Sequence, residues 1–121
     1  MNDELKQEFD SALVKHLHFK SKLRSFLYGS GTSEEPIRDP RACSFGRWIL
    51  ERALPDYRHL PETQQLDRVH LQIHQAANRL MDLHKRGQAD AAIDGLAEVN
   101  QLADQVTRLL RTMEAKLRAD L

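Results

Sequence analysis

One cysteine and six histidines are the residues of this chain best suited to metal or redox chemistry. His70 and His74 stand four residues apart, so on a helix they project from one face about 6 Å apart along the axis and can reach one ion. His16 interrupts the apolar stripe of an earlier segment, and Cys43 is the only thiol. Three imidazoles and one thiolate are the donors of a closed tetrahedral Zn(II) site. The alternative is a set of hydrogen-bonded core histidines and a buried small cysteine.

Four segments with helical periodicity must position these residues. Apolar side chains recur every three or four residues in three of them, and the fourth is a short apolar segment closed by Pro55. No segment shows the alternation of a strand. The sequence predicts an all-α fold, an antiparallel four-helix bundle with three long helices and one short helix that carries the cysteine. The predicted helices cover residues 4–28, 43–53, 61–86 and 89–119.

The depths of the four residues along these helices predict that they meet. His16 lies about 18 Å before the end of the first helix, and His70 and His74 lie about 12 and 18 Å after the start of the third. Those depths coincide if the two helices are antiparallel neighbours. The connecting segment 29–42 is long enough to return and set Cys43 beside them. At a helix start, the dipole is expected to lower the pKa of the Cys43 thiol.

Other polar residues near this set are weaker candidates. His18 lies on the opposite side of its helix from His16, and His84 is too far along the axis from His74. His59, in a loop, is the only credible substitute ligand. Asp67 stands one turn before His70. Its carboxylate either accepts a hydrogen bond from a histidine ring and so fixes the tautomer of that ring, or is a solvated surface acid.

Three motifs in order resemble the chemoreceptor zinc-binding domain, or CZB domain. That family has a His followed three residues on by an aromatic residue or Leu, then Cys-x-apolar-Gly-x-apolar, then His-x-x-x-His. The corresponding segments here are 16–19, 43–48 and 70–74, and the resemblance covers about residues 9–84. Within the second motif, Gly46 would let the short helix approach the metal face closely. The aromatic residues of the motifs would form an apolar shell around the ion.

The resemblance implies a zinc-binding sensory or regulatory domain of bacterial signal transduction, with His16, Cys43, His70 and His74 as ligands. Such domains accompany chemoreceptors and diguanylate cyclases, and they tune chemotaxis or cyclic di-GMP signalling. Family members are also linked to redox sensing of hypochlorous acid through the cysteine. The implied partners are therefore a chemoreceptor, a diguanylate cyclase or another signalling protein, and a second copy in a homodimer.

Composition and missing motifs exclude several other functions. Lys plus Arg and Asp plus Glu both number 18 in 121 residues, so the net charge is zero and no basic face for nucleic acid is expected. We expect a single domain, residues 1–121, that is cytoplasmic and does not bind a membrane, because neither a signal peptide nor a long apolar run occurs. We also expect no enzyme, since Leu71 stands where a zinc protease helix has its general-base Glu.

A different class of function also fits the pattern. In the last predicted helix, apolar residues recur in alternating steps of three and four from Leu96 to Leu117, a heptad seam of three repeats. The seam could mediate dimerisation without any sensing. The alternative is therefore a structural interaction module in which zinc is a permanent staple or is absent.

Overall fold

The computed structural model describes residues 3–29 and 31–120, and in these ranges the chain is helical with no strand. The predicted all-α class is confirmed. Ser30, in the predicted loop, falls outside the described residues. The helices in chain order are α1 (Asp3–Leu27), α2 (Glu35–Arg38), α3 (Ser44–Trp48), the π-helix η1 (Ile49–Ala53), α4 (Leu54–Asp56), α5 (Pro61–Lys85), α6 (Ala89–Asp94) and α7 (Leu96–Ala119).

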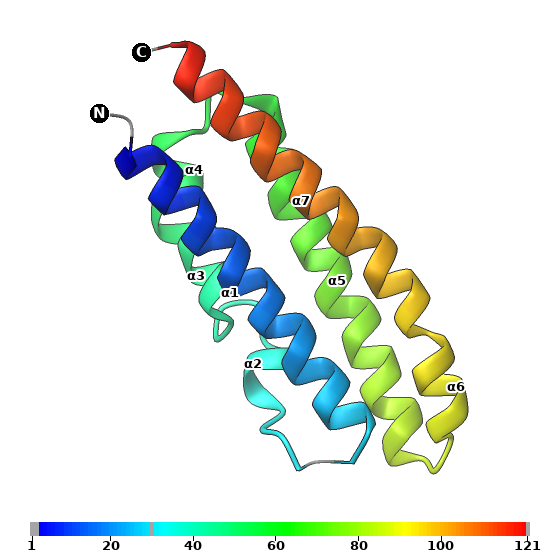
Figure 1. Cartoon of the computed structure of the whole chain (residues 1–121). Helices are drawn as coiled ribbons and strands as arrows, with labels where there is room; N and C mark the ends of the chain where they lie inside the picture. The colour runs from blue at the N-terminus through cyan, green and yellow to red at the C-terminus, as the bar shows by residue number, and fades with distance from the viewer. Residues whose placement is uncertain (1–2, 30, 121) are drawn as a thin grey trace.

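The long helices α1 and α5 run in the same direction (Figure 1). Phe19 meets His74 with ring centroids 4.6 Å apart, and further along both helices Phe26 meets His84 at 5.2 Å. The expectation that these two helices are antiparallel neighbours is therefore wrong. The cause is the segment of α3, η1 and α4, which runs antiparallel to α1. The chain therefore returns to the level of the start of α1 before α5 begins. His16 still lies at about the level of His70 and His74 along the helix axes. It is near the middle of α1, so its distance from either end of that helix is similar.

The cysteine-bearing segment is one helical run with a widened turn. It was expected to end at about Ala53, closed by Pro55, but α4 carries it to Asp56. Proline lacks an N–H and its ring collides with the carbonyl four residues earlier in a regular α-helix. In η1 the Leu54 amide instead bonds the Ile49 carbonyl, five residues back. This π-turn widens the backbone ahead of Pro55, so the helix continues through the proline.

The far end of this segment is fastened to α1 by one carboxylate, that of Glu8. It accepts hydrogen bonds from Trp48 Nε1 at 3.1 Å, Arg52 Nε at 2.9 Å and the Tyr57 hydroxyl at 2.5 Å. Burial and the bond to Glu8 raise the pKa of Tyr57 to about 12. Glu8 thus fixes the position of α3, η1 and α4 along α1.

The heptad seam of the last predicted helix is used inside the chain. Gly95 separates α6 from α7, and α7 packs antiparallel on α5, with Lys116 Nζ 2.8 Å from Glu62 Oε2. The seam side chains buried within the chain are Val99, Ala103, Val106, Leu110 and Met113. They are therefore not available to pair with a second copy.

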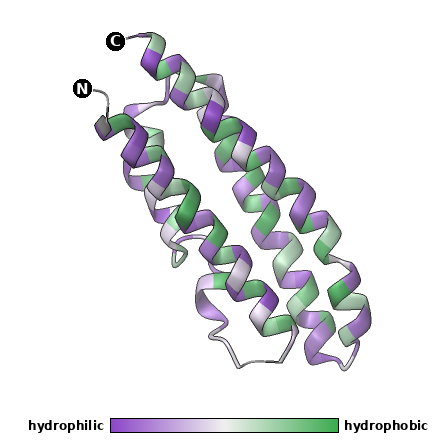
Figure 2. Cartoon of the chain, in the orientation of Figure 1, coloured by the Kyte–Doolittle hydropathy of each residue, from purple (hydrophilic) through white to green (hydrophobic). Residues whose placement is uncertain are grey.

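Polar and apolar residues alternate around every long helix (Figure 2). Each helix therefore turns one side toward the core and the other toward solvent. Among the described residues, none of the helices is both long enough and apolar enough to cross a membrane.

Candidate metal centre

Three of the four predicted ligands come together in the interior. The ligand atoms of Cys43, His70 and His74 all lie within 4.8 Å of one another. The side chains are buried, with 3%, 4% and 1% of their surface exposed. Cys43 directly precedes α3, and the two histidines lie in the middle of α5, so the cluster joins two elements that are distant in sequence.

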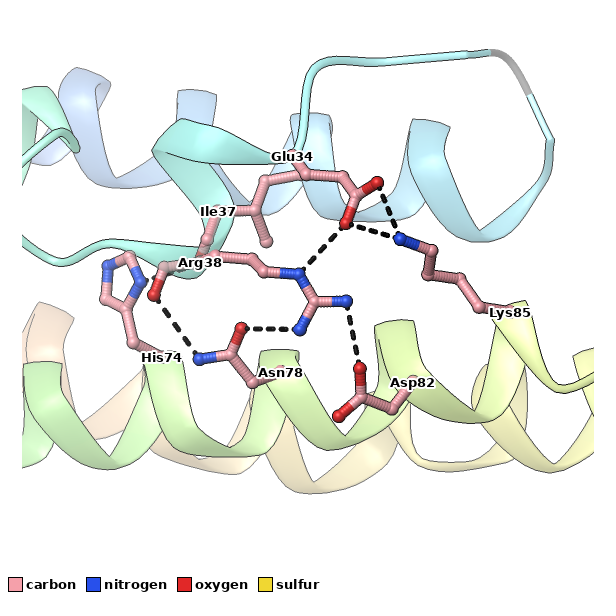
Figure 3. A network of polar contacts seen from close by, with 7 residues as sticks. All are labelled: Glu34, Ile37, Arg38, His74, Asn78, Asp82 and Lys85. Atoms are coloured by element: carbon pink, nitrogen blue, oxygen red, sulfur yellow. Dashed lines mark hydrogen bonds and ion pairs between the residues drawn. The ribbon is translucent and has the colours of Figure 1, made fainter.

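The two imidazoles of this cluster face each other through the same ring atom. Nε2 of His70 and Nε2 of His74 are 3.1 Å apart, close to the roughly 3.3 Å that separates two nitrogens bound to one tetrahedral zinc ion. The other ring nitrogen of His74, Nδ1, donates to the Ile37 carbonyl at 2.7 Å (Figure 3). A carbonyl can only accept, so this bond fixes the Nδ1–H tautomer and leaves the Nε2 lone pair directed at the cluster.

Burial keeps the histidines neutral in the metal-free chain. It is the main cause that lowers the pKa of His70 to about 3, and charge on His74 and on His16 would add to the effect. Burial also lowers the pKa of His74, although the bond to Ile37 opposes it. Neutral imidazole is the form that binds metal, and the Nε2 lone pair of His74, which accepts from His70 Nε2–H, is available at neutral pH.

The pKa of Cys43 departs from the prediction. Burial raises it, and the backbone N–H groups of Gly46 and Phe45 lower it by less. Both N–H groups belong to the first turn of α3, so they represent the effect of the helix start on the sulfur. The expected net effect of the helix start is therefore wrong for the metal-free chain, because desolvation of the thiolate outweighs the dipole.

Gly46 sets how closely α3 approaches the cluster. A Cβ atom at this position would overlap the Pro40 carbonyl oxygen and stand 2.8 Å from Cε1 of His70. Its φ angle is not in the left-handed region, so glycine is needed here for space rather than for backbone freedom. The predicted role of Gly46 is consistent with this packing.

His16, the fourth predicted ligand, lies beside the cluster but not within its 4.8 Å group. Its ring centroid is 5.3 Å from that of Phe45, whose own ring is 5.5 Å from that of His70. Burial, and then the charge of Lys20, lowers the pKa of His16 to about 4, while a hydrogen bond to the Ala103 backbone raises it. Nε2 of His16 is buried and has no hydrogen-bond partner.

The remaining candidates lie elsewhere. His18 is exposed on α1, His59 is exposed in the turn before α5, and His84 lies in the last turn of α5 against Phe26. The ring of His74 bonds the Ile37 carbonyl, and the role predicted for Asp67 one turn before His70 stays a prediction. Sequence reasoning missed this acceptor, because every residue has a backbone carbonyl and no side-chain type marks the one that is used.

The three motif segments are also where the chain matches a known family. The sequence profile of the chemoreceptor zinc-binding domain matches residues 16–81, more than half of the chain. The chain belongs to the chemoreceptor zinc-binding domain family. As a CZB domain it is a zinc-binding signalling domain, and the match begins at His16 and includes the whole cluster. No curated protein and no solved structure shows significant similarity to the chain.

The donors of this CZB domain fit zinc on several counts. A thiolate and neutral imidazoles bind zinc in preference to magnesium or calcium, which take oxygen ligands. The 3.1 Å between the two Nε2 atoms suits a shared small ion. The buried Nε2 of His16, which lacks any partner, is an unsatisfied acceptor or donor beside the cluster. Such groups are rare in native structures, and a metal ion is one explanation for them.

Proposed function

We propose that the chain is a sensory or regulatory domain of bacterial signal transduction that binds one Zn(II) through His16, Cys43, His70 and His74. The observation that carries this proposal is the buried cluster of one cysteine and two histidines inside a CZB match. The protein supplies one thiolate and three neutral imidazoles, and bound zinc would supply the positive charge that keeps Cys43 deprotonated.

Two features support His16 as the fourth ligand. Its Nε2 is buried without a partner, while its ring is hydrogen-bonded to the Ala103 backbone. As at His74, a backbone group thus holds the ring, which leaves Nε2 for a metal ion. Metal-bound histidines in proteins almost always have such an outer partner.

We infer that the domain binds zinc and catalyses no reaction. Four protein ligands would close the tetrahedral site, whereas catalytic zinc sites keep a position for water. We further infer an antiparallel four-helix bundle in which the segment of α3, η1 and α4 is the fourth helix, and a cytoplasmic location for the domain.

We propose that ligand binding at this site controls how the bundle packs against a partner. The ligands connect α1, α5 and the Cys43 segment, so zinc occupancy would favour one arrangement of these three elements. A ligand present at 100 times its dissociation constant stabilises the binding-competent state by about 2.7 kcal/mol. The output would be chemotaxis or cyclic di-GMP control, through a chemoreceptor or diguanylate cyclase in which the domain pairs with a second copy.

We further propose that the site responds to oxidants through Cys43. Oxidation of this residue would remove the only anionic ligand and leave three neutral imidazoles, so zinc would be held less firmly.

Elemental analysis tests the metal site directly. Protein purified without added metal should hold about one zinc per chain, as should His18→Ala, which removes an exposed histidine. His70→Ala should fall below about 0.2 zinc per chain. A low zinc content of the wild type, unchanged in His70→Ala, would refute the metal site.

Three further measurements separate the finer parts of the proposal. Cobalt-loaded protein should show sulfur-to-cobalt charge-transfer absorption that Cys43→Ser abolishes, and His16→Ala should weaken zinc binding while His59→Ala does not. Helical circular dichroism during zinc removal by a chelator distinguishes a sensor from a staple. A sensor stays folded when zinc leaves, whereas complete unfolding would identify zinc as a permanent structural staple.

A further inference from the structure

A polar network joins the short helix α2 to α5 beside His74 (Figure 3). Two successive carbonyls at the end of α2 are bound by α5 side chains one turn apart. The Ile37 carbonyl accepts from His74 Nδ1 at 2.7 Å, and the Arg38 carbonyl accepts from Asn78 Nδ2 at 3.3 Å. The last carbonyls of a helix have no partner within the helix, so these two bonds satisfy groups that α2 itself leaves open.

The Arg38 side chain extends the network along the same face of α5. Its guanidinium donates to Asn78 Oδ1 at 3.2 Å and to Asp82 Oδ1 at 2.9 Å. The third contact is to Glu34 Oε1 at 2.9 Å, and Glu34 in turn lies 3.0 Å from Lys85 Nζ. One planar guanidinium thus joins both elements, because its fork of donors matches several acceptors at once.

The short helix has little else to fix its orientation. It has four residues and no side-chain cap at its start, and only Ile37 is buried. Ile37 holds α2 to the core on one side, while Arg38 holds it to α5 on the other. Without the Arg38 contacts, the exposed ion pair between Glu34 and Lys85 would hold α2 only weakly, so α2 could turn about Ile37 and carry the Ile37 carbonyl away from His74.

We propose that Arg38 and Asn78 are positioning residues of the metal centre. They hold the end of α2 so that the Ile37 carbonyl fixes His74 in the Nδ1–H tautomer with Nε2 directed at Cys43 and His70. The inference rests on the proposed function in one respect, since it takes zinc as the ion that the Nε2 lone pair receives. The tautomer itself is a property of the metal-free chain.

The test compares full-length wild type with Arg38→Ala and Asn78→Ala. Asn78→Ala removes the bond to the Arg38 carbonyl and one bond of the guanidinium, but leaves the guanidinium its contacts with Glu34 and Asp82. Arg79→Ala is the matched control, because the next residue of α5 makes an exposed ion pair with Glu98 outside the network. The readouts are the ¹⁵N shifts of the His74 ring without metal, the zinc dissociation constant by chelator competition, and the unfolding free energy.

We expect wild type and Arg79→Ala to show one His74 tautomer and equal zinc affinity. Arg38→Ala, which removes every guanidinium contact, should show both tautomers and bind zinc about tenfold more weakly, and Asn78→Ala should shift both readouts in the same direction by a smaller amount. The proposal is overturned if both variants lose stability yet keep the Nδ1–H tautomer and wild-type zinc affinity. If the wild type itself binds no zinc, the proposed function fails, while the ring shifts still decide whether Arg38 and Asn78 position His74.

Discussion

Replacing Gly46 with alanine tests the close packing on which the metal centre depends. The added Cβ would overlap the Pro40 carbonyl oxygen and crowd the His70 ring at 2.8 Å from Cε1. The Pro40 oxygen belongs to the backbone and cannot rotate aside as a side chain would. Helix α3 must therefore move away from the Pro40 carbonyl and the His70 ring, and it carries Cys43, three residues earlier, with it.

The size of the effect of Gly46→Ala follows from two opposing contributions. Overpacking a tight interior costs about 1–3 kcal/mol, and a backbone contact puts this case at the upper end. Alanine favours a helix over glycine by about 1 kcal/mol, which offsets part of the loss. We expect the unfolding free energy to fall by about 2 kcal/mol, which lowers Tm by about 8 °C in a domain of this size. Zinc affinity should fall by about tenfold or more, because two ligands are displaced.

Chemical denaturation and chelator competition measure the two quantities, and Gly95→Ala is the control. Gly95 also has an ordinary helical backbone, with φ of −70°, but its added Cβ would meet chiefly the end of the flexible Leu80 side chain, away from the metal centre. That variant should stay within about 1 kcal/mol of wild type and bind zinc normally. If Gly46→Ala is as stable as wild type and its zinc affinity is unchanged, the packing argument is wrong.

Three other properties of the chain can be predicted from the same contacts. The metal-free protein should lose stability as the pH falls from 6.5 toward 4. In the folded chain His70 and His16, with pKa values of about 3 and about 4, stay neutral, whereas in the unfolded chain they bind protons over this range. Each contributes up to about 1.4 kcal/mol per pH unit, measurable by urea denaturation. Glu8→Gln should lower the pKa of Tyr57 from about 12 but leave it above 10, since burial remains, as an ultraviolet titration would record. Alkylation of metal-free Cys43 should be at least about tenfold slower in the folded than in the unfolded chain, because the thiol is buried and its pKa is raised.

Each of these predictions has a result that contradicts it. Equal unfolding free energies at pH 7 and pH 5 would mean that the histidines are not held neutral by burial. In a Tyr28→Phe background, which isolates Tyr57, an unchanged titration midpoint in Glu8→Gln would remove the carboxylate as a cause of the shift. Equal alkylation rates before and after unfolding would show that Cys43 is open to solvent.

The residues of the cluster could be predicted from the sequence because their spacing has a direct geometric meaning. The step of four residues from His70 to His74 is a little more than one helical turn, so any helix places both on one face. Cys43 was placed beside them from the length of the connecting segment and the length of the short helix that leads to the third. His16 was predicted at the same depth, and the structure brings it to the edge of the cluster.

What the sequence could not predict depends on tertiary contacts. The direction of α1 relative to α5 follows from where the Cys43 segment runs, and periodicity carries no information on that. The Ile37 carbonyl is a backbone group without a side-chain signature, so its role at His74 could not be found. The pKa of Cys43 depends on how deeply the thiol is buried, which outweighs the dipole effect that sequence position alone suggested.

The π-turn of η1 fixes the angular relation between the two ends of the Cys43 segment. A π-turn is equivalent to one residue inserted into an α-helix, and one residue corresponds to a rotation of about 100°. Gly46 before the turn faces the metal centre, while Tyr57 after it is bound to Glu8 on α1. Deleting a single residue from Ile49–Ala53 would restore a regular helix and rotate one end of the segment relative to the other. Gly46 could then no longer face the metal centre while Tyr57 binds Glu8. The segment should therefore tolerate substitution at its exposed positions far better than any change in its length.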